Sequence, residues 1–501
     1  MDKKIVLLPL DDRPCNRVFP QNLFGDDKVA FTVMQELGEK KIPAQYDKIK
    51  EFLLQECRDA YGLVVSMDML LYGGLLPSRL HHMRLEEVKE RARMLRQLRR
   101  ENPDLLIYAF QTIMRCPTYS SSMEEPDYYG ACGAEIYKTG ELLHKQQLGI
   151  AFDENPEEVR SRLTPGALED YTARRACNEA MDEETLLYVK EGTIDLLIFP
   201  QDDCSRYGFT AMDRLKIQKK ISEFCLDEKV MTYPGADEVG MTLIARMINT
   251  LYGKRPKVYV KYTSENVRQM IPLYEGSMLG RTIRNHLYAA GCLQTDCWEL
   301  ADIILGVSAA GVMEEAIDQP CWREEYYAER NLGEFTDFLQ EMTKEGKIVT
   351  LADNAYANGG DLQLVQLLDK KGMLMELDGY AGWNTSANTL GTAIAESVAV
   401  YYQGKTDRHR HFMVERYLED VGYCSVVRPS VSKKVVAMGM DSCSLKEKHG
   451  IVSAMASRQL HRFADEYLSS IADRVRIINL FMPWERMFEV EIWAEYQERG
   501  A

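Results

Sequence analysis

The sequence lacks the motifs that mark several common enzyme classes. It has no Gly-x-Gly-x-x-Gly segment after an apolar run, no Walker loop and no Gly-x-Ser-x-Gly elbow, so nucleotide cofactors and acyl-serine chemistry have no support. None of its eight histidines follows an apolar run that reads as a strand, which leaves a His-based triad or a His-rich zinc site without support. We therefore expect no cofactor.

Paired cysteines, an export signal and long apolar segments are also missing. The twelve cysteines are scattered without Cys-x-x-Cys spacing, which indicates reduced core or surface thiols. The apolar run that follows Lys3 and Lys4 stops at Asp11, too early for a signal-peptide core or a membrane span. We therefore expect a cytoplasmic protein with no membrane partner.

The charge balance argues against nucleic acid as a partner. The chain has 77 acidic and 61 basic side chains, a net charge of −16, and no run rich in Lys and Arg, whereas phosphate backbones are bound by clustered positive charge. With 501 residues the chain is long enough for two or three domains. The sequence leaves open whether the protein is a homo-oligomer.

The sequence does contain a repeated layout in which short runs of Val, Ile and Leu end in polar residues. The clearest run, 194–199, is followed by Pro-Gln-Asp-Asp. Short runs that are apolar on both faces are typical of parallel strands buried on both sides, and ligands bind at the carboxyl ends of such strands. Eight strands are expected, at 4–10, 62–68, 104–111, 194–203, 229–234, 257–262, 301–307 and 347–353.

Eight strands of this kind favour a closed (β/α)8 barrel within an α/β fold. Two doubly wound parallel sheets in tandem are the alternative, because they give the same local pattern. The segment 258–307 reads as strand, helix, strand, like half of a flavodoxin-type domain. We expect a catalytic domain over residues 1–397, with an insertion at about 112–192, and a helical C-terminal domain over residues 398–501.

Polar side chains follow the first three expected strands. Asp11, Asp12 and Arg13 lie in a turn stiffened by two prolines. Arg offers a fixed fork of donors and Asp accepts from sugar hydroxyls, so this turn suits a ligand clamp, although an internal ion pair would also explain it. The next two strand ends add Asp68, Gln111 and Arg115.

Two acidic pairs, Asp202-Asp203 and Asp237-Glu238, also follow strands. Side chains of adjacent strand residues point to opposite faces, so such a pair can act on one substrate only where the strand has ended. The second pair also precedes a helix, where the helix dipole favours acidic residues for structural reasons. Asp202 and Asp203 are therefore the first choice as catalytic residues.

Two later loops are dense in amides, hydroxyls and aromatic rings. One contains Asn358, and the other contains Trp383 and Asn384. Such groups suit a carbohydrate site, but Asn-rich turns around a core tryptophan would give the same composition. The sequence identifies no definite metal ligands, and a Mg²⁺ or Mn²⁺ site built only from carboxylates is left open. It would draw on Asp11, Asp12, Asp68 or Asp353.

Taken together, the segments PLDDRPCN (9–16), YGGLLPSR (72–79), the Gln-Asp-Asp strand end and GWNT (382–385) resemble a bacterial family of unknown function. An acidic pair after the fourth strand of a barrel is also similar to the hexosaminidases that use the 2-acetamido group of the substrate as nucleophile. That similarity implies that Asp202 orients the acetamido group and that Asp203 is the general acid.

Our hypothesis from the sequence is a glycoside hydrolase with a small N-acetylhexosaminide as substrate, similar to a β-N-acetylgalactosaminidase, acting by the substrate-assisted retaining mechanism. A metal-dependent hydrolase or isomerase of sugar derivatives and a noncatalytic sugar-binding protein are the alternatives. The residues expected to bind substrate are Asp11, Asp12, Arg13, Asp68, Gln111, Arg115, Asp237, Glu238, Asn358, Trp383 and Asn384.

Overall fold

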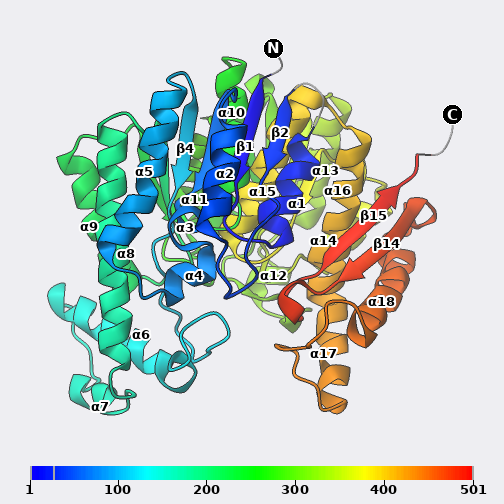
Figure 1. Ribbon diagram of the computed structural model, residues 1–501. Coiled ribbons are helices and arrows are strands. Elements are labelled where there is room, and N and C mark those ends of the chain that lie inside the picture. The colour runs from blue at the N-terminus through cyan, green and yellow to red at the C-terminus, as the bar shows by residue number, and fades with distance from the viewer. Residues whose placement is uncertain (1–2, 26–28, 499–501) are drawn as a thin grey trace. The chain divides into compact units, whose positions relative to one another are not determined.

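The strands form two separate parallel sheets. The structure, a computed structural model, describes residues 3–25 and 29–498. A six-stranded sheet has the order β2-β1-β3-β4-β5-β6, and a five-stranded sheet has the order β13-β11-β9-β7-β8 (Figure 1). All eight expected strands are confirmed. The chain divides into two compact units, each of which contains one of these sheets.

The first unit comprises residues 1–12, 25–240 and 274–277. Its strands are short apolar runs, and the central ones are buried along their whole length, as expected for a sheet covered on both faces. In order along the chain, the strands of the first sheet are β1 (Lys4–Leu8), β2 (Ala30–Val33), β3 (Gly62–Ser66), β4 (Leu106–Phe110), β5 (Leu196–Gln201) and β6 (Val230–Pro234).

One face of the first sheet packs against amphipathic helices. A single buried cluster joins the alternate strand residues Val65, Ile107 and Phe199 to apolar residues of these helices, for example Leu95. The helices of this unit are α2 (Tyr46–Glu56), α3 (Met67–Tyr72), α4 (Leu75–Leu80), α5 (Leu85–Glu101), α6 (Tyr129–Gln147), α7 (Pro156–Ser161), α8 (Ala167–Lys190) and α9 (Phe209–Glu223).

The expected insertion after the third apolar strand corresponds to α6, α7 and α8. Figure 1 shows α6 and α7, in cyan, on the side toward which the strands of this sheet point, together with α4. The long helix α8 then returns along the sheet and packs against α5 and α9. The insertion therefore reaches the carboxyl edge of the first sheet, where the polar strand ends lie.

The second unit comprises residues 13–24, 241–273 and 278–501. Its strand order corresponds to 2-1-3-4-5, the flavodoxin-like order of doubly wound sheets. The half domain expected at 258–307 supplies its first three strands. The strands of this sheet are β7 (Lys257–Tyr262), β8 (Leu293–Thr295), β9 (Ile303–Ser308), β11 (Ile348–Asp353) and β13 (Gly379–Ala381), and two short strands, β10 (Glu314–Glu315) and β12 (Tyr356–Ala357), pair with each other.

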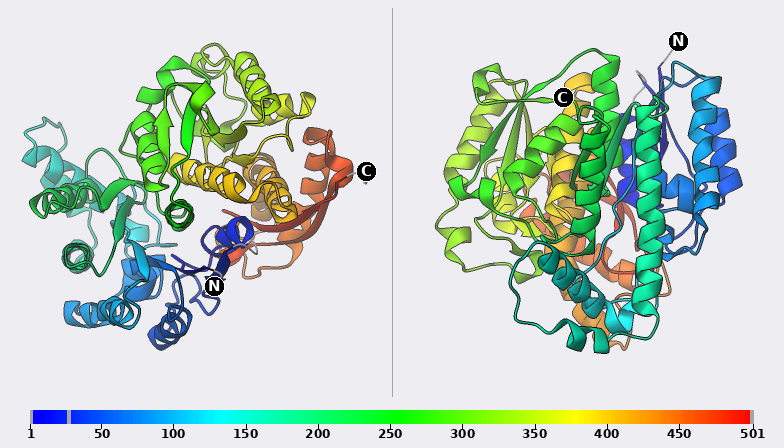
Figure 2. Two further views of the ribbon diagram at one scale, coloured as in Figure 1. Left: turned by 90° about the horizontal axis from the view of Figure 1, so that it is seen from above. Right: turned by 90° about the vertical axis from the view of Figure 1, so that its left-hand side faces the viewer.

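Helices cover both faces of the second sheet. Helix α15 (Ser386–Gln403), yellow-orange in Figure 2, packs on β9, β11 and β13 and also contacts α11 (Leu279–Ala289). Helix α13 (Leu332–Lys344) packs on β9 and β11. The remaining helices of this unit are α1 (Pro14–Phe24), α12 (Glu324–Tyr327) and α14 (Leu362–Lys370), and α10 (Val239–Leu251) begins in the first unit and continues in the second.

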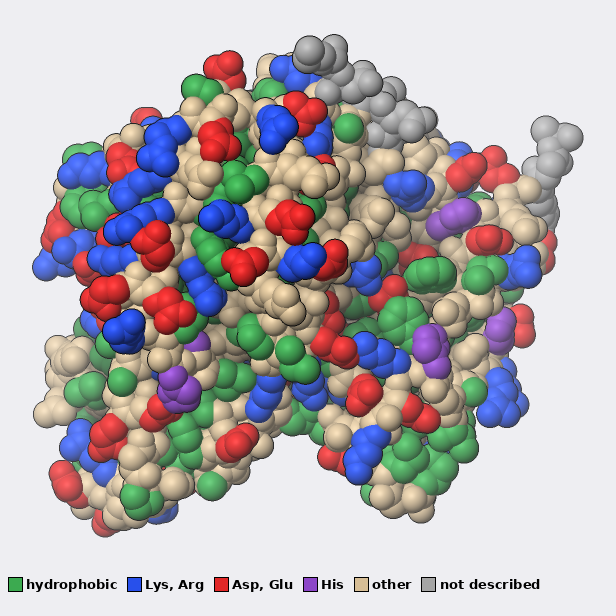
Figure 3. Space-filling view, viewed as in Figure 1, with side chains coloured by type: hydrophobic (Ala, Val, Ile, Leu, Met, Phe, Trp, Pro, Cys, Tyr) green, Lys and Arg blue, Asp and Glu red, His purple; other side chains and the backbone are tan. Residues whose placement is uncertain are grey.

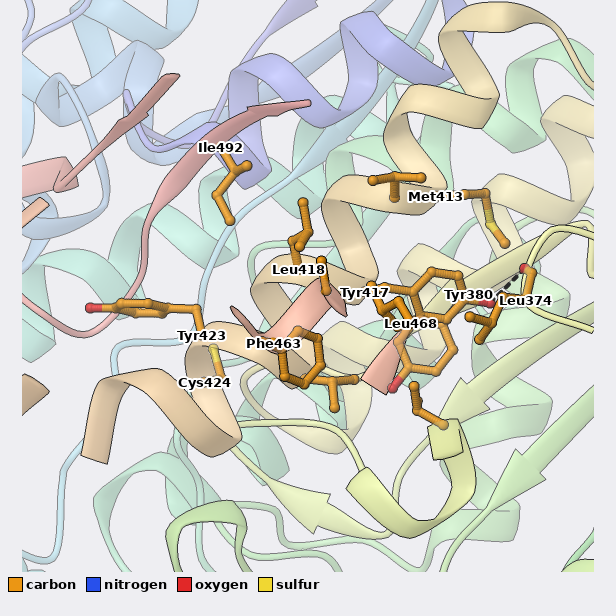
Figure 4. Packing of buried hydrophobic residues seen from close by; sticks show 14 of the residues in the cluster. Leu374, Tyr380, Met413, Tyr417, Leu418, Tyr423, Cys424, Phe463, Leu468 and Ile492 are labelled. Carbon is orange, nitrogen blue, oxygen red and sulfur yellow. Dashed lines mark hydrogen bonds between the residues drawn. The ribbon is translucent and has the colours of Figure 1, made fainter. Parts of the chain in front are cut away.

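Residues 398–501 share one hydrophobic core with the second sheet. Tyr380 of β13, Tyr417 and Phe463 belong to the same buried cluster, and the Tyr417 hydroxyl donates to the Leu374 carbonyl at 2.9 Å (Figure 4). The expected helical domain over residues 398–501 is not clearly shown, because this segment also contains an antiparallel pair of strands, and the domain boundary at 397 stays a prediction. The segment forms α16 (Asp407–Arg416), a π-helix η4 (Tyr417–Val427), α17 (Arg428–Ala437), α18 (Ile451–Tyr467) and the antiparallel pair, β14 (Val475–Phe481) with β15 (Glu491–Tyr496).

The favoured barrel is not confirmed, and the strands instead adopt the tandem arrangement that was the alternative. In a closed barrel the first and last strands would pair, but β2 and β6 are the edges of the first sheet, and β7 belongs to a different sheet. The local apolar pattern predicts a buried strand but does not say which strand it pairs with, so it could not separate the two folds.

The charges on the face of the molecule seen in Figure 3 are mixed rather than grouped by sign. Lys and Arg side chains alternate with Asp and Glu over α2 and α5. Among the described residues, no helix combines the length and the apolar composition needed to cross a membrane.

Candidate active site

The polar residues that follow β1, β3, β4 and β5 lie along one edge of the first sheet. Asp11 comes three residues after β1, Asp68 lies in α3 directly after β3, and Gln111 and Asp202 are the first residues beyond β4 and β5. Because these strands are parallel, their carboxyl ends meet at the same edge. These four residues therefore share one edge of the sheet, and the expectation from the sequence that they line a single pocket together with Asn384 stays a prediction.

Two buried arginines hold the acidic pair at the end of β5. A guanidinium nitrogen of Arg79 donates to Asp202, and Arg115 Nη1 donates to Asp203 Oδ2 at 2.6 Å. The side chains of Arg79 and Arg115 are only 2% and 7% exposed, whereas that of Asp203 is 20% exposed. Each aspartate therefore has its own guanidinium, and both aspartates are more exposed than the arginines that bind them.

A second acidic pair, Glu124 and Glu125, binds the same two arginines. Glu124 accepts from Arg79 at 3.3 Å and from Arg115 at 2.8 Å, and Glu125 accepts from the same two residues at 3.3 and 2.7 Å. Both glutamates come from the segment between β4 and α6. Four carboxylates thus surround two guanidinium groups, and the cluster has a net charge of −2 when every group is ionised.

Asp203 combines an unusual backbone conformation with a perturbed pKa. Its φ is +32°, in a region that residues other than glycine seldom occupy. Burial raises the pKa of Asp203 to about 6, the Arg115 guanidinium opposes this rise, and the neighbouring Asp202 carboxylate adds to it. A carboxyl group with such a pKa can carry a proton in mildly acidic solution and release it to a substrate.

The long helix α8 fixes the segments that carry both arginines. Tyr171 and Arg175 donate to the backbone carbonyl of Arg115 at 2.7 and 3.0 Å. Asn178 of the same helix donates to the carbonyl of Ser78, next to Arg79, at 2.9 Å. The insertion therefore positions the arginine pair.

The turn before Arg79 requires glycine. Gly73 and Gly74 connect α3 to α4 with φ values of +86° and +140°, which favour glycine because it has no Cβ. A Cβ on Gly73 would lie 2.8 Å from the backbone nitrogen of Ala44. The glycines of the YGGLLPSR segment thus set the path of the short helix that carries Arg79.

Asp68 and Gln111 are buried and bonded within the first unit. Asp68 accepts from the backbone N–H of Thr112 at 2.9 Å, and burial raises its pKa to about 6 while this hydrogen bond opposes the rise. The Gln111 side chain accepts from the hydroxyl of Thr185 in α8 at 2.7 Å. Both residues join neighbouring segments at the sheet edge, and their expected role in substrate binding stays a prediction.

The other predicted residues of the first unit lie at the same edge. Asp11 is 5% exposed, and Asp12 is partly buried. Asp237 and Glu238 are buried and directly precede α10, and Glu238 accepts from the backbone N–H of Ala236 at 3.0 Å. This position agrees with the structural role that the helix dipole gives to an acidic pair.

Four predicted residues belong to the second unit. Arg13 is 5% exposed, and its guanidinium lies 4.8 Å from the ring centroid of Trp484. Asn358 donates to Glu315 at 3.0 Å, and its backbone N–H donates to the carbonyl of Asn384 at 2.8 Å. A role for these residues in binding sugar stays a prediction.

Trp383 is packed as a core residue. Only 7% of it is exposed, and its ring meets the ring of Phe19 edge-on with centroids 5.7 Å apart. Its indole N–H donates to the hydroxyl of Thr392 at 3.2 Å. These contacts match the alternative reading of the Asn-rich turn around a core tryptophan.

The glycines of the second unit's polar loops make room for a buried hydrogen-bond network. Asp353 accepts from the Tyr380 hydroxyl at 2.8 Å and from the N–H of Asp361 at 2.7 Å. A Cβ on Gly360 would lie 2.3 Å from the Tyr380 hydroxyl oxygen, and one on Gly382 would lie 2.8 Å from it. The polar composition of these loops is therefore largely explained by internal bonding.

The described residues contain no group of three or more His, Cys, Asp or Glu side chains that could hold a metal ion. Asp353 belongs to the second unit, whereas Asp11, Asp12 and Asp68 belong to the first. The acidic residues of the arginine cluster have guanidinium groups as partners. The carboxylate-only metal site that the sequence left open is thus not found among the described residues.

Sequence reasoning missed both glutamates of the cluster, because they lie in a polar segment with no strand pattern. It noted Arg79 without including it among the site residues. It also set aside the histidines, yet His144 of α6 accepts from the backbone N–H of Gly208 at 3.3 Å, in the turn that follows Asp203.

These features define an α/β protein of two doubly wound parallel sheets, with an arginine-bridged acidic cluster at the carboxyl edge of the first. The family model described as a protein of unknown function, DUF4127, matches residues 5–493, and the chain belongs to this family. Membership agrees with the expected resemblance to a family of unknown function. A comparison with curated proteins finds no match.

Among solved structures, the chain is similar to a glycoside hydrolase family 138 enzyme that targets pectin rhamnogalacturonan II. The identity is 10%, and the TM-score is 0.20. The alignment covers 94% of this chain and 44% of that enzyme, so the chain spans less than half of its length. A superposition with this TM-score supports no statement about fold or activity.

Proposed function

We propose that the protein is a glycoside hydrolase that cleaves small N-acetylhexosaminides, with Asp203 as the general acid. The observation that carries the proposal is the unequal environment of the Asp202-Asp203 pair at the end of β5. Both carboxyl groups are bound to buried guanidinium groups, Asp202 to Arg79 and Asp203 to Arg115, but Asp203 alone of the pair has a left-handed backbone, and burial raises its pKa to about 6. Neighbouring carboxyl groups in different environments can divide the roles of proton donor and charged partner.

In the proposed reaction, Asp203 protonates the glycosidic oxygen as the bond to the leaving group breaks. The carbonyl oxygen of the substrate's own 2-acetamido group attacks the anomeric carbon, and Asp202 orients that group through its N–H and stabilises the charge that develops on it. Water then opens the cyclic intermediate with Asp203 as base, so that the anomeric configuration is retained. A β-linked N-acetylgalactosaminide is our first choice of substrate.

The charge of the cluster also limits the substrates that we propose. With Asp203 protonated, three carboxylates and two guanidinium groups remain, and the net charge is −1. A substrate with a carboxylate next to the scissile bond would add negative charge to a site that already has an excess of it. We therefore expect neutral sugars to be preferred over acidic ones.

Release of chromophore from a panel of aryl glycosides, with and without EDTA, tests the proposal. Hydrolysis of an N-acetylhexosaminide in the presence of EDTA is the expected result. Activity that depends on added metal would favour a metal-dependent hydrolase or isomerase of sugar derivatives. Binding of glycosides without turnover would instead favour a noncatalytic sugar-binding protein.

A further inference from the structure

The charge of Arg115 is shared between the proposed general acid and the two glutamates. Its three guanidinium nitrogens each serve a different carboxylate: Nη1 donates to Asp203 at 2.6 Å, Nη2 to Glu124 at 2.8 Å and Nε to Glu125 at 2.7 Å. A guanidinium that interacts with three carboxylates stabilises each of them less than it would stabilise one alone. The ionised form of Asp203 therefore depends on its competitors for this arginine.

The segment that carries the competing glutamates is fixed within the first unit. The ammonium group of Lys41 donates to the carbonyls of Ser122 and Glu125 at 2.7 and 3.0 Å. Nearer the start of the segment, the carbonyl of Pro117 accepts a hydrogen bond from the hydroxyl of Tyr129 in α6 at 2.9 Å. The negative charges of the glutamates are thus held at fixed positions beside the arginines.

We propose that Glu124 is a positioning residue that keeps Asp203 in its acid form by competing with it for the guanidinium of Arg115. This inference rests on the proposed role of Asp203 as general acid. Of the two glutamates, Glu124 raises the pKa of Asp203, and 19% of its side chain is exposed, against 1% for Glu125. A neutral residue can therefore replace it without burying an uncompensated polar group.

The charged and titratable groups that face Asp203 come from three segments. Arg79 belongs to α4. Asp202 and Cys204 are the residues on either side of Asp203 in the sequence. The segment after β4 supplies Arg115, Tyr119, Glu124 and Glu125. Among these groups, the two arginines lower the pKa of Asp203, whereas Asp202 and Glu124 raise it. Replacing Glu124 by a neutral residue removes one of the raising charges and leaves Arg115 with one carboxylate fewer, so both effects act in the same direction.

The variant Glu124→Gln keeps the shape of the side chain and removes its charge. We expect the pKa of Asp203 to fall by about one pH unit, within the range of shifts that a neighbouring charge causes. The matched control is Asp127→Asn, which removes an exposed carboxylate from the same segment. The control should leave the pKa of Asp203 unchanged.

The experiment is a pH titration of the full-length protein labelled with ¹³C at the aspartate carboxyl carbon, in which the Asp203 signal is assigned by its loss in Asp203→Asn. A lower pKa in Glu124→Gln with no change in the control supports the proposal. An unchanged pKa, or an equal shift in both variants, overturns it. Glu124→Ala removes the same charge and serves for the titration if Glu124→Gln does not fold.

A kinetic measurement separates this inference from the proposed function. For a glycoside with a poor leaving group, the high-pH limb of kcat/KM should shift to lower pH in Glu124→Gln by the same amount as the titration. If the pKa shifts but no glycoside is cleaved by the unchanged protein, the effect of Glu124 on the protonation of Asp203 stands and the proposed function is wrong. If glycosides are cleaved but neither measurement shifts, the function stands and the positioning role is wrong.

Discussion

Asp203 and Asp202 are adjacent residues to which the proposed mechanism gives different tasks. Asp203→Asn should slow the hydrolysis of glycosides with poor leaving groups by roughly 10²–10⁴-fold, the usual contribution of general acid catalysis. The hydrolysis of activated aryl glycosides should be almost unchanged, because their leaving group needs no proton. Asp202→Asn should slow both substrate types, because the acetamido group must be oriented whatever group leaves. Initial rates with matched pairs of leaving groups measure the difference.

Equal and small losses in both variants, on both substrate types, would identify Asp202 and Asp203 as a structural pair. The arginines would then serve only to neutralise them. Asp237 and Glu238 would become the catalytic candidates, since they lie at the same edge of the sheet.

Asp68 gives a prediction about the pH dependence of stability. Its pKa is about 6 in the folded protein, against an ordinary value of 3.8, so the folded chain holds this proton more tightly than the unfolded chain. Its contribution to stability is therefore complete below about pH 4 and is lost as the pH rises through 6. Asp68→Asn keeps an acceptor for the Thr112 N–H and does not titrate. As the pH rises from 4 to 8, the free energy of unfolding of this variant should therefore increase by roughly 3 kcal/mol relative to that of the unchanged protein, which corresponds to about two pKa units.

Urea unfolding at several pH values measures this gain. The exposed Asp104 provides the control, because Asp104→Asn should show the same pH dependence as the unchanged protein. A stability difference for Asp68→Asn that does not vary with pH would mean that the buried carboxyl group does not titrate as described.

At the scale of single residues, the sequence predicted at which strand ends polar residues lie, but it did not predict which residues they contact. Asp202 and Asp203 could be singled out because they follow an apolar run. Glu124 and Glu125 could not, because their partners are distant in sequence and only the fold brings them together. Trp383 could be read as a platform for a sugar or as a core residue, and its contact with Phe19 depends on a helix more than 360 positions earlier.

At the scale of elements, α8 provides a test of how the arginine pair is positioned. Tyr171→Phe removes the hydroxyl that donates to the Arg115 carbonyl, and we expect a loss of about 1 kcal/mol in the free energy of unfolding. We also expect kcat/KM to fall by roughly 10-fold, because small displacements of a positioning group reduce the rate. Urea unfolding and initial rates measure the two effects.

Tyr417→Phe is the matched control for this helix. Tyr417 is also fully buried and donates to a single backbone carbonyl, but it lies in the second unit. The control should lose similar stability and keep its activity. A similar loss of activity in both variants would show that α8 has no special role.

The accuracy of the predicted strands also depended on their environment. The eight long apolar runs were recognisable because strands buried on both faces contain little else. Seven strands of the described residues were missed. Among them, β2 and β8 are mostly exposed or half-buried, the Gly-Tyr-Ala sequence of β13 has no strand pattern, and β14 and β15 lie in the segment that was expected to be helical. Pairing between strands is set by contacts across the chain, which is why two open sheets were not distinguished from a barrel.

At the scale of the whole molecule, the shared core of the second unit predicts the outcome of a truncation. A chain ending at residue 397 would lose Leu418 and Phe463, which belong to the same buried cluster as residues of β11 and β13. We expect this fragment to aggregate or to bind hydrophobic dyes, because a large apolar surface would face water. Size-exclusion chromatography and dye binding measure the result, with the full chain as reference. A fragment that unfolds cooperatively would confirm a domain boundary near residue 397.

Helix α1 contributes to the second unit although it begins only fourteen residues into the chain. Asn22 donates to Glu415 at 3.4 Å across 393 positions, and the ring of Phe19 meets that of Phe412 edge-on at 5.2 Å. At a ribosomal rate of about 5–20 residues per second, roughly 20–80 s separate the synthesis of these partners. Until Trp383, Phe412 and Glu415 have been synthesised, the apolar side of α1 lacks the contacts that it makes in the folded unit, so the nascent chain presents a binding site for chaperones that is withdrawn only once these residues are available.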